Sequence, residues 1–297
     1  MKKFFTRNAP GYIFLTPWFL GFFLLAIGPI LASLYLSFTK YDMVSDPQWV
    51  GLKNYDYMFN RDRRFWKALT VTFSYVAMAV PARLAMALAV AMLLDKGLRT
   101  IGLYRAIFYL PSLLGASIAI AILWQQLFEV NGVVNRLLAM VGIDGPAWIS
   151  DPKTSLYTLV VLAMWQFGSP MLIFLAGLRG IPKDLYEAAE IDGTSKWRQF
   201  TRITLPLLAP VIFFNLVLQT IEAFKTFSSA FIISNGTGAP ADSLLFYTVY
   251  LFNEAFKFFR MGYASALAWV LLIIIGFFTA VSFLTSKYWV HYDNERD

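Results

Sequence analysis

The 297-residue chain contains no cysteine and only one histidine, His291. Without a thiol it can form no disulfide and can offer no thiolate nucleophile or soft metal ligand. A single histidine also excludes a histidine-rich metal centre. We therefore expect this chain to bind neither a metal ion nor a cofactor.

Charged residues are also scarce. They make up 14% of the chain, whereas soluble proteins carry about 25%, and 58% of the residues are hydrophobic. The net charge of +7 would suggest a nucleic acid partner in a soluble protein. Here Lys and Arg cluster at the ends of apolar runs, as they do beside anionic lipid and in cytoplasmic loops. The composition predicts a membrane protein with no nucleic acid partner.

Six apolar runs reach the length of roughly 20 residues that a transmembrane helix requires. They lie at about 11–38, 68–94, 105–128, 154–178, 204–232 and 263–286. We expect an all-α membrane protein with six transmembrane helices, formed by a single domain over residues 1–297, because no repeat or low-complexity segment is visible. No small-residue cleavage site follows the first run, so we interpret it as an uncleaved span.

The basic residues predict the orientation of the chain. They gather in the N-terminal segment, in the loops between spans two and three and between spans four and five, and in the C-terminal tail, including Lys2, Lys3, Arg7, Lys96, Arg99, Arg105, Arg179, Lys183, Lys196, Arg198, Arg202, Lys287 and Arg296. The loop between spans one and two is an exception, with six basic residues and four aspartates. With six spans, the pattern places both termini in the cytoplasm.

The segment between spans four and five has the local signals of two short helices. Pro182 suits the first turn of a helix, and Gly193 suits a left-handed residue that ends it. Thr194 or Ser195 can cap the second helix, which carries Trp197. Such a rigid unit fits a helix seated in the groove of a partner, but it equally fits an amphipathic helix lying at the membrane surface.

Residues 187–206 resemble the EAA signature of ABC importer permeases. The matching positions, at the spacing of that family, are Glu187, Ala188, Ala189, Gly193, Ile203, Leu205 and Pro206. The stretches "PWFLGFFLLAIGPILASLYLSFTKYD", "WVGLKNY", "FLAGLRGIPKDLYEAAEIDG" and "MGYASALAW" are similar to maltose- and glycerol-phosphate-type permeases of the carbohydrate-uptake class. Two departures are "NGTGAP" in place of a Gly-Gly-Gly-Pro loop and the lack of the large extracytoplasmic insert of the maltose permease, so maltose is not favoured.

The resemblance implies a function and a set of partners. Residues 182–193 would form a coupling helix, and Glu187, Ala188, Ala189, Asp192 and Gly193 would contact a separate ATP-hydrolysing subunit. Two such subunits would bind ATP and Mg²⁺, since this chain has no Gly-x-x-x-x-Gly-Lys-Ser/Thr loop and is not expected to be an enzyme. A second homologous permease would complete a heterodimer. A solute-binding protein would deliver a sugar or oligosaccharide for import by alternating access across the bacterial cytoplasmic (inner) membrane.

Polar residues inside the spans are candidates for the cargo site, because ionisable groups in lipid are costly. Gln219, Glu222, Ala223 and Thr226 recur at helical spacing in span five, and Gln166 follows Trp165 in span four. Amides, carboxylates and aromatic rings together can hold a sugar. We predict that Gln219, Glu222, Ala223, Gln166 and Trp165 bind substrate, with Phe224 as another aromatic nearby.

Alternatives remain open at this stage. The same polar residues can join helices to one another, and Glu222 can pair with Arg83 or Lys225. An ion-coupled secondary transporter would need a buried carboxylate relay, for which only Glu222 is a candidate. A membrane enzyme would need a catalytic group of residues, and no paired carboxylates, cysteine or intramembrane histidine are present.

Overall fold

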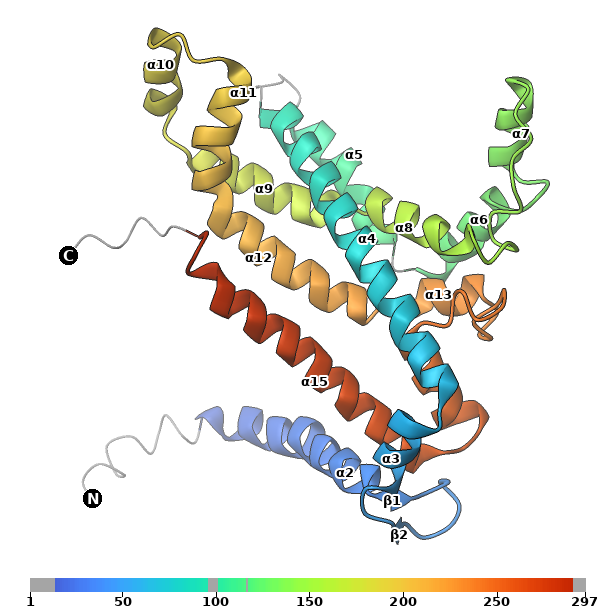
Figure 1. Ribbon diagram of the computed structural model, residues 1–297. Helices are drawn as coiled ribbons and strands as arrows, with labels where there is room; N and C mark the ends of the chain where they lie inside the picture. Colours follow the sequence, from blue (N-terminus) through green and yellow to red (C-terminus); the bar gives the residue numbers. More distant parts are fainter. Residues whose placement is uncertain (1–13, 96–100, 116, 291–297) are drawn as a thin grey trace, which may run out of the picture. The chain divides into compact units, whose positions relative to one another are not determined.

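The computed structural model describes residues 14–95, 101–115 and 117–290, and nearly all of their regular secondary structure is helical (Figure 1). In chain order the elements, with η marking π-helical turns, are η1 (Phe22–Ile27), α2 (Gly28–Ser37), β1 (Thr39–Lys40), β2 (Gln48–Trp49), α3 (Lys53–Asn60), α4 (Arg63–Asp95), α5 (Ile101–Leu114), α6 (Ile118–Leu127), α7 (Val133–Met140), α8 (Ser155–Trp165), α9 (Gly168–Gly180), α10 (Lys183–Ile191), α11 (Lys196–Gln199), η2 (Phe200–Thr204), α12 (Leu205–Phe224), α13 (Ser228–Ile233), α14 (Tyr247–Phe252), η3 (Asn253–Lys257) and α15 (Met261–Ser286). The all-α class is confirmed. His291 and the basic residues Lys2, Lys3, Arg7, Lys96, Arg99 and Arg296 lie outside the described residues.

Helices cover all six regions in which the sequence predicts a span. Four helical segments are long and apolar enough to cross a membrane: Phe14–Ser37, Arg63–Asp95, Lys196–Ile233, which runs from α11 to α13, and Met261–Ser286. The third and fourth predicted spans are each a pair of helices, bent by 94° between α5 and α6 and by 43° between α8 and α9. The described chain therefore has four membrane-length helices, or six if each bent pair is one span.

The corner between α8 and α9 has a local cause. In a helix the carbonyl of Gln166 would accept from the N–H of residue 170, but that residue is Pro170, which has none. Two side chains from other helices replace the missing donor: Arg83 Nε lies 2.9 Å from the Gln166 carbonyl oxygen, and Ser112 Oγ lies 2.8 Å from it. Side chains of α4 and α5, rather than a backbone N–H, thus supply the hydrogen bonds that the Gln166 carbonyl needs at this corner.

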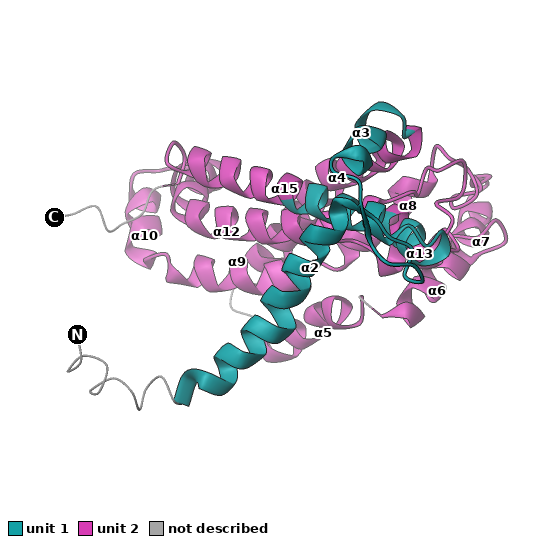
Figure 2. Ribbon diagram, turned by 90° about the horizontal axis from the view of Figure 1, so that it is seen from below, with its two compact units in different colours: residues 1–62, 251–272 teal, residues 63–250, 273–297 magenta. Residues whose placement is uncertain are grey.

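The contacts of the chain divide into two compact units, coloured separately in Figure 2. Unit 1 comprises residues 1–62 and 251–272. In it, Asn54 Nδ2 donates to the carbonyls of Ser37 (2.8 Å) and Thr39 (2.9 Å), which fixes the end of α2 against α3. The hydroxyl of Tyr263 donates to the buried carboxylate of Asp62. A polar clamp therefore joins the N-terminal elements of this unit to α15.

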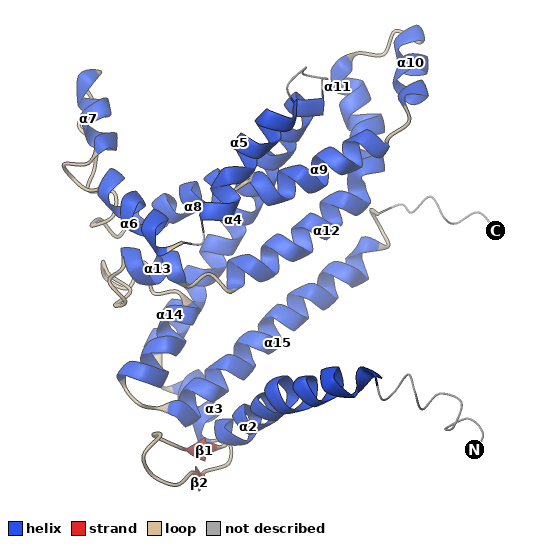
Figure 3. Cartoon of the chain, turned by 180° about the vertical axis from the view of Figure 1, so that it is seen from behind, coloured by secondary structure: helices blue, strands red, loops and turns tan. Residues whose placement is uncertain are grey.

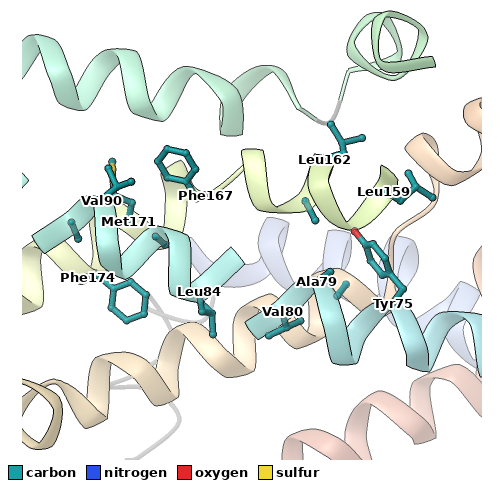
Figure 4. Packing of buried hydrophobic residues seen from close by; sticks show 14 of the residues in the cluster. Tyr75, Ala79, Val80, Leu84, Val90, Leu159, Leu162, Phe167, Met171 and Phe174 are labelled. Atoms are coloured by element: carbon teal, nitrogen blue, oxygen red, sulfur yellow. The ribbon is translucent and has the colours of Figure 1, made fainter. Parts of the chain in front are cut away.

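Unit 2 comprises residues 63–250 and 273–297 and contains the main hydrophobic core. Its centre is the packing of α4 on α8 and α9, where Leu84, Leu162, Met171 and Phe174 are buried (Figure 4). Figures 1 and 3 place α10 and α11 at one end of this unit and α7 at the other.

Candidate functional site

Unit 2 contains a cavity of about 460 Å³, within the range of roughly 300–1,000 Å³ typical of small-molecule sites. Its walls come from α4, α5, the α8–α9 corner, the end of α12 and the start of α13. The lining residues are Tyr75, Ala79, Val80, Arg83, Ser112, Gly115, Leu162, Ala163, Gln166, Ser169, Gln219, Glu222, Ala223, Lys225, Thr226, Phe227, Ser228 and Ser229. Hydroxyls, amides and charged groups alternate with apolar side chains around it.

Gln219 lines this cavity, and its side chain carries a buried acceptor that is not used. Its side chain is only 7% exposed, and its Oε1 has no hydrogen-bond partner among the described residues. A buried polar atom without a partner costs about 1–3 kcal/mol, so such atoms are rare in folded proteins and need an explanation. This oxygen is inaccessible in the observed side-chain orientation, so a hydroxyl or N–H group of a bound molecule would satisfy it only after the amide turns toward the cavity.

Glu222 lies one helical turn from Gln219 and forms an ion pair inside the chain. Its Oε1 is 2.8 Å from Lys225 Nζ, and both side chains are more than half exposed (61% and 52%). A solvated pair of this kind contributes about 0–1 kcal/mol to stability. Of the two partners considered from the sequence, the structure selects Lys225; the described contacts include no hydrogen bond or ion pair between Glu222 and Arg83.

Gln166 joins the cavity wall to the helix corner. Its Nε2 donates to the Gly115 carbonyl at 3.0 Å, while its backbone carbonyl accepts the bonds from Arg83 and Ser112. Ser112 Oγ also accepts from the N–H of Ser169 at 3.1 Å. This network fixes the orientation of Gln166 and Arg83, which both line the cavity.

The structure brings four of the five predicted substrate residues together, because Gln166, Gln219, Glu222 and Ala223 all line this cavity. Trp165 does not line it. Its ring instead packs at a tilt on Trp124, with the ring centroids 6.0 Å apart.

Two other residues near the predicted substrate residues of span five, Phe224 and Thr226, also differ from expectation. Phe224 is 1% exposed and packs on Phe73 and Phe278, so its ring does not reach the cavity. Thr226 lies beyond the end of α12, although it still lines the cavity.

Sequence reasoning missed the aromatic residues that do line the cavity, Tyr75 and Phe227. Tyr75, Ala79 and Arg83 are spaced four residues apart and share one face of α4. That spacing from Arg83 was a usable signal for Tyr75.

A second candidate surface lies on α10 and the turn that follows it. Gly193 has a φ of +69°, the left-handed conformation predicted for it. The N–H of Thr194 donates to Ala189 (2.9 Å) and that of Gly193 to Glu190 (3.0 Å), the paired bonds of a Schellman motif. Ser195 occupies the N-cap of α11, but its side chain makes no capping hydrogen bond.

One face of α10 is fixed to the unit, and the other is open. The hydroxyl of Tyr186 lies 2.9 Å from Thr204 Oγ1, which attaches α10 to the base of the following long helix. Ile191 is 88% exposed and Trp197 is 73% exposed. The predicted coupling residues Glu187, Ala188, Asp192 and Gly193 are also exposed, whereas Ala189 is partly buried. Large apolar side chains this exposed on a polar-rimmed surface are typical of a docking site.

Comparisons with known proteins give a consistent result. Residues 57–288 match the family described as "Binding-protein-dependent transport system inner membrane component". The chain is 50% identical to a probable ABC transporter permease protein, YesP of Bacillus subtilis (strain 168), over 98% of this chain and 94% of that protein. It is 32% identical to the lactose transport system permease protein LacF of Rhizobium radiobacter, over 97% of this chain and 96% of that protein.

A solved structure has the same fold. A chain in the crystal structure of a bacterial alginate ABC transporter, in complex with an alginate pentasaccharide-bound periplasmic protein, superposes with a TM-score of 0.82 over 97% of both chains, at 20% sequence identity.

Proposed function

Because the chain belongs to the family of binding-protein-dependent transport system inner membrane components and is a multi-pass ABC importer permease, we propose that it moves a sugar or oligosaccharide through the cavity of unit 2. Membership of this family decides against an ion-coupled secondary transporter. It also assigns the chain a role in transport rather than catalysis.

A saccharide cargo is supported by a relative and by the chemistry of the cavity. The name of LacF assigns lactose to that permease. In this chain the observation that carries the proposal is Gln219, a residue of the cavity wall whose buried Oε1 has no partner among the described residues. Once the amide turns toward the cavity, this oxygen can accept from a sugar hydroxyl, and the exposed carboxylate of Glu222 can do the same. Ring faces of the sugar would meet Tyr75 and Phe227.

The proposed architecture follows the family. Residues 1–297 form one transmembrane domain with six spans, counting each bent pair as one, and both termini lie in the cytoplasm. The chain resides in the bacterial cytoplasmic membrane and pairs with a second, homologous permease. A solute-binding protein docks outside and two ATPase subunits dock inside, so that ATP binding and hydrolysis alternate the access of the cavity between the two sides.

The α10 surface is the proposed contact with an ATPase subunit. Its exposed residues, Glu187, Ala188, Asp192, Gly193 and Ile191, would sit in a groove of that subunit together with the partly buried Ala189. A rigid helix held by Tyr186 can transmit a displacement, whereas a flexible loop would absorb it.

Uptake by the complete transporter in proteoliposomes tests the cargo proposal. Gln219→Ala removes one contact to a hydroxyl, and Glu222→Gln replaces a charged acceptor by a weaker neutral one. Each loss is worth about 0.5–1.5 kcal/mol, so saccharide uptake should fall by up to about tenfold. Selectivity among several oligosaccharides should change, while the melting temperature should not. Gln126→Ala, at an exposed position of α6 away from the cavity, serves as the matched control. A lowered melting temperature with unchanged selectivity would instead show that both residues join helices of the bundle to one another.

A further inference from the structure

The charges of the unit 2 cavity do not balance. Three lining residues carry full charges at neutral pH: Arg83, Lys225 and Glu222. Glu222 and Lys225 are paired with each other at 2.8 Å. No other acidic residue is among the described residues that line the cavity, so one positive charge is in excess.

Arg83 lies deep within α4. Between Lys67 and Asp95 this helix has no other charged residue, and the helix is long enough to cross the membrane. An ionisable group near the middle of a membrane-spanning helix costs at least about 2.5 kcal/mol, and such residues are usually functional. Arg83 therefore requires a role that offsets this cost.

Capping the helix corner is not a sufficient role. Arg83 Nε donates to the Gln166 carbonyl at 2.9 Å, but the neutral hydroxyl of Ser112 already donates to the same oxygen at 2.8 Å. A second neutral donor could do the same work without the cost of a charge. The positive charge is thus better explained by an anion that enters the cavity.

We propose that the cavity selects a saccharide with a single carboxylate, a uronic acid, and that Arg83 is the residue that recognises this group. The proposal rests on the proposed function and names the class of its cargo. A guanidinium group matches the planar carboxylate with two parallel donors. The Gln219 amide, which belongs to the lining of the same cavity, can hydrogen-bond a hydroxyl of the same molecule. A single excess charge also fits a carboxylate better than a phosphate ester, which carries about −1.5 to −2 at neutral pH.

Thiol protection measures occupancy of the cavity directly. Since the chain has no cysteine, Ser228→Cys places one thiol of this subunit on the cavity wall. The complete transporter in nanodiscs is labelled with N-ethylmaleimide, and labelling of this subunit is followed with increasing saccharide. The probes are a disaccharide with one galacturonate residue, its methyl ester and galactose 6-phosphate. The acid should protect the introduced thiol from labelling at a concentration roughly ten- to a hundredfold lower than the ester, as expected for a charge-assisted contact.

Arg83 variants test the assignment to this residue. Arg83→Gln should erase the difference in protecting concentration between acid and ester. Arg83→Lys should retain part of this difference, because lysine keeps the positive charge but lacks the two parallel donors of the guanidinium group. Damage to the fold would weaken the binding of the acid and of the ester alike. The ratio of their protecting concentrations therefore separates a loss of carboxylate recognition from a loss of structure. Arg136→Gln is the matched control, because Arg136 Nε also donates to a backbone carbonyl but lies outside this cavity, and it should preserve the ratio.

The outcomes distinguish the two proposals. Equal protection by acid and ester, or an unchanged ratio in Arg83→Gln, would overturn carboxylate recognition while leaving the transport of sugars intact. Tighter protection by galactose 6-phosphate would overturn the choice of carboxylate over phosphate. Failure of the reconstituted transporter to take up any saccharide, acidic or neutral, would overturn both.

Discussion

Replacement of Gly193 by valine should open the turn that ends α10. Gly193 has a φ of +69°, a conformation that costs an L-residue roughly 1–2 kcal/mol and is worse for a β-branched one. No atom lies within 4 Å of the position that a Cβ would take. The cost is therefore purely conformational, with no contribution from steric overlap with neighbouring groups.

A matched control isolates the backbone term. Gly180, at the end of α9, also has open space around its missing Cβ, but its φ is not positive. Gly180→Val introduces the same side chain at a site where the backbone accepts it. Gly193→Asn should be intermediate, since asparagine tolerates the left-handed region.

Amide hydrogen exchange of the purified protein provides the readout. The N–H groups of Gly193 and Thr194 are bonded to Glu190 (3.0 Å) and Ala189 (2.9 Å). A penalty of about 1–2 kcal/mol corresponds to a roughly 5- to 30-fold loss of protection at these two amides. Protection that is equal in Gly193→Val and Gly180→Val would refute the reasoning from φ.

Two further substitutions probe contacts described above. If Glu187 forms an ion pair with the proposed ATPase subunit, Glu187→Ala should leave the protein in the membrane but abolish ATP-driven uptake by the reconstituted complex, because truncating one member of a desolvated charge pair costs about 2–5 kcal/mol. Glu190→Ala, whose partner Lys196 lies in the same chain and is exposed, should retain uptake, and equal activity of the two variants would contradict the coupling role. Gly168→Ala should lower stability by about 1–3 kcal/mol, since its Cβ would lie 2.7 Å from the Phe108 carbonyl oxygen, whereas Gly102→Ala meets no atom within 4 Å and should melt like the unmodified protein.

The α10 turn could be predicted from sequence because its signals are local. Pro182 before the helix and Gly193 after it lie within a dozen residues, and each acts on its own backbone. The structure has α10 at Lys183–Ile191, inside the expected 182–193. Ser195 takes the N-cap position of α11 without a capping hydrogen bond, so a suitable residue type at this position did not by itself predict the bond.

The cavity could be predicted only in part. Gln219 and Glu222 are one turn apart, so helical spacing alone places them on one face. Trp165 adjoins Gln166 in the sequence, but neighbouring residues point to different sides of a helix, which explains its contact with Trp124 instead.

The break in the fourth span depends on partners that are distant in sequence. Pro170 signals a missing donor locally, yet Arg83 and Ser112, which replace it, are 83 and 54 residues from Gln166 along the chain. No periodicity within span four reports such contacts.

The carbonyl of Gln166 links the position of three chain segments through a single atom. Because Arg83 and Ser112 share this acceptor, any molecule that draws the guanidinium toward itself changes how firmly the α8–α9 corner is held. Linkage requires the reverse as well: a corner that shifts alters the affinity of Arg83 for its ligand by the same factor. If Arg83 recognises the cargo, an occupied cavity and an empty one differ in the stiffness of the bend, and the corner serves as a sensor of occupancy inside the membrane domain.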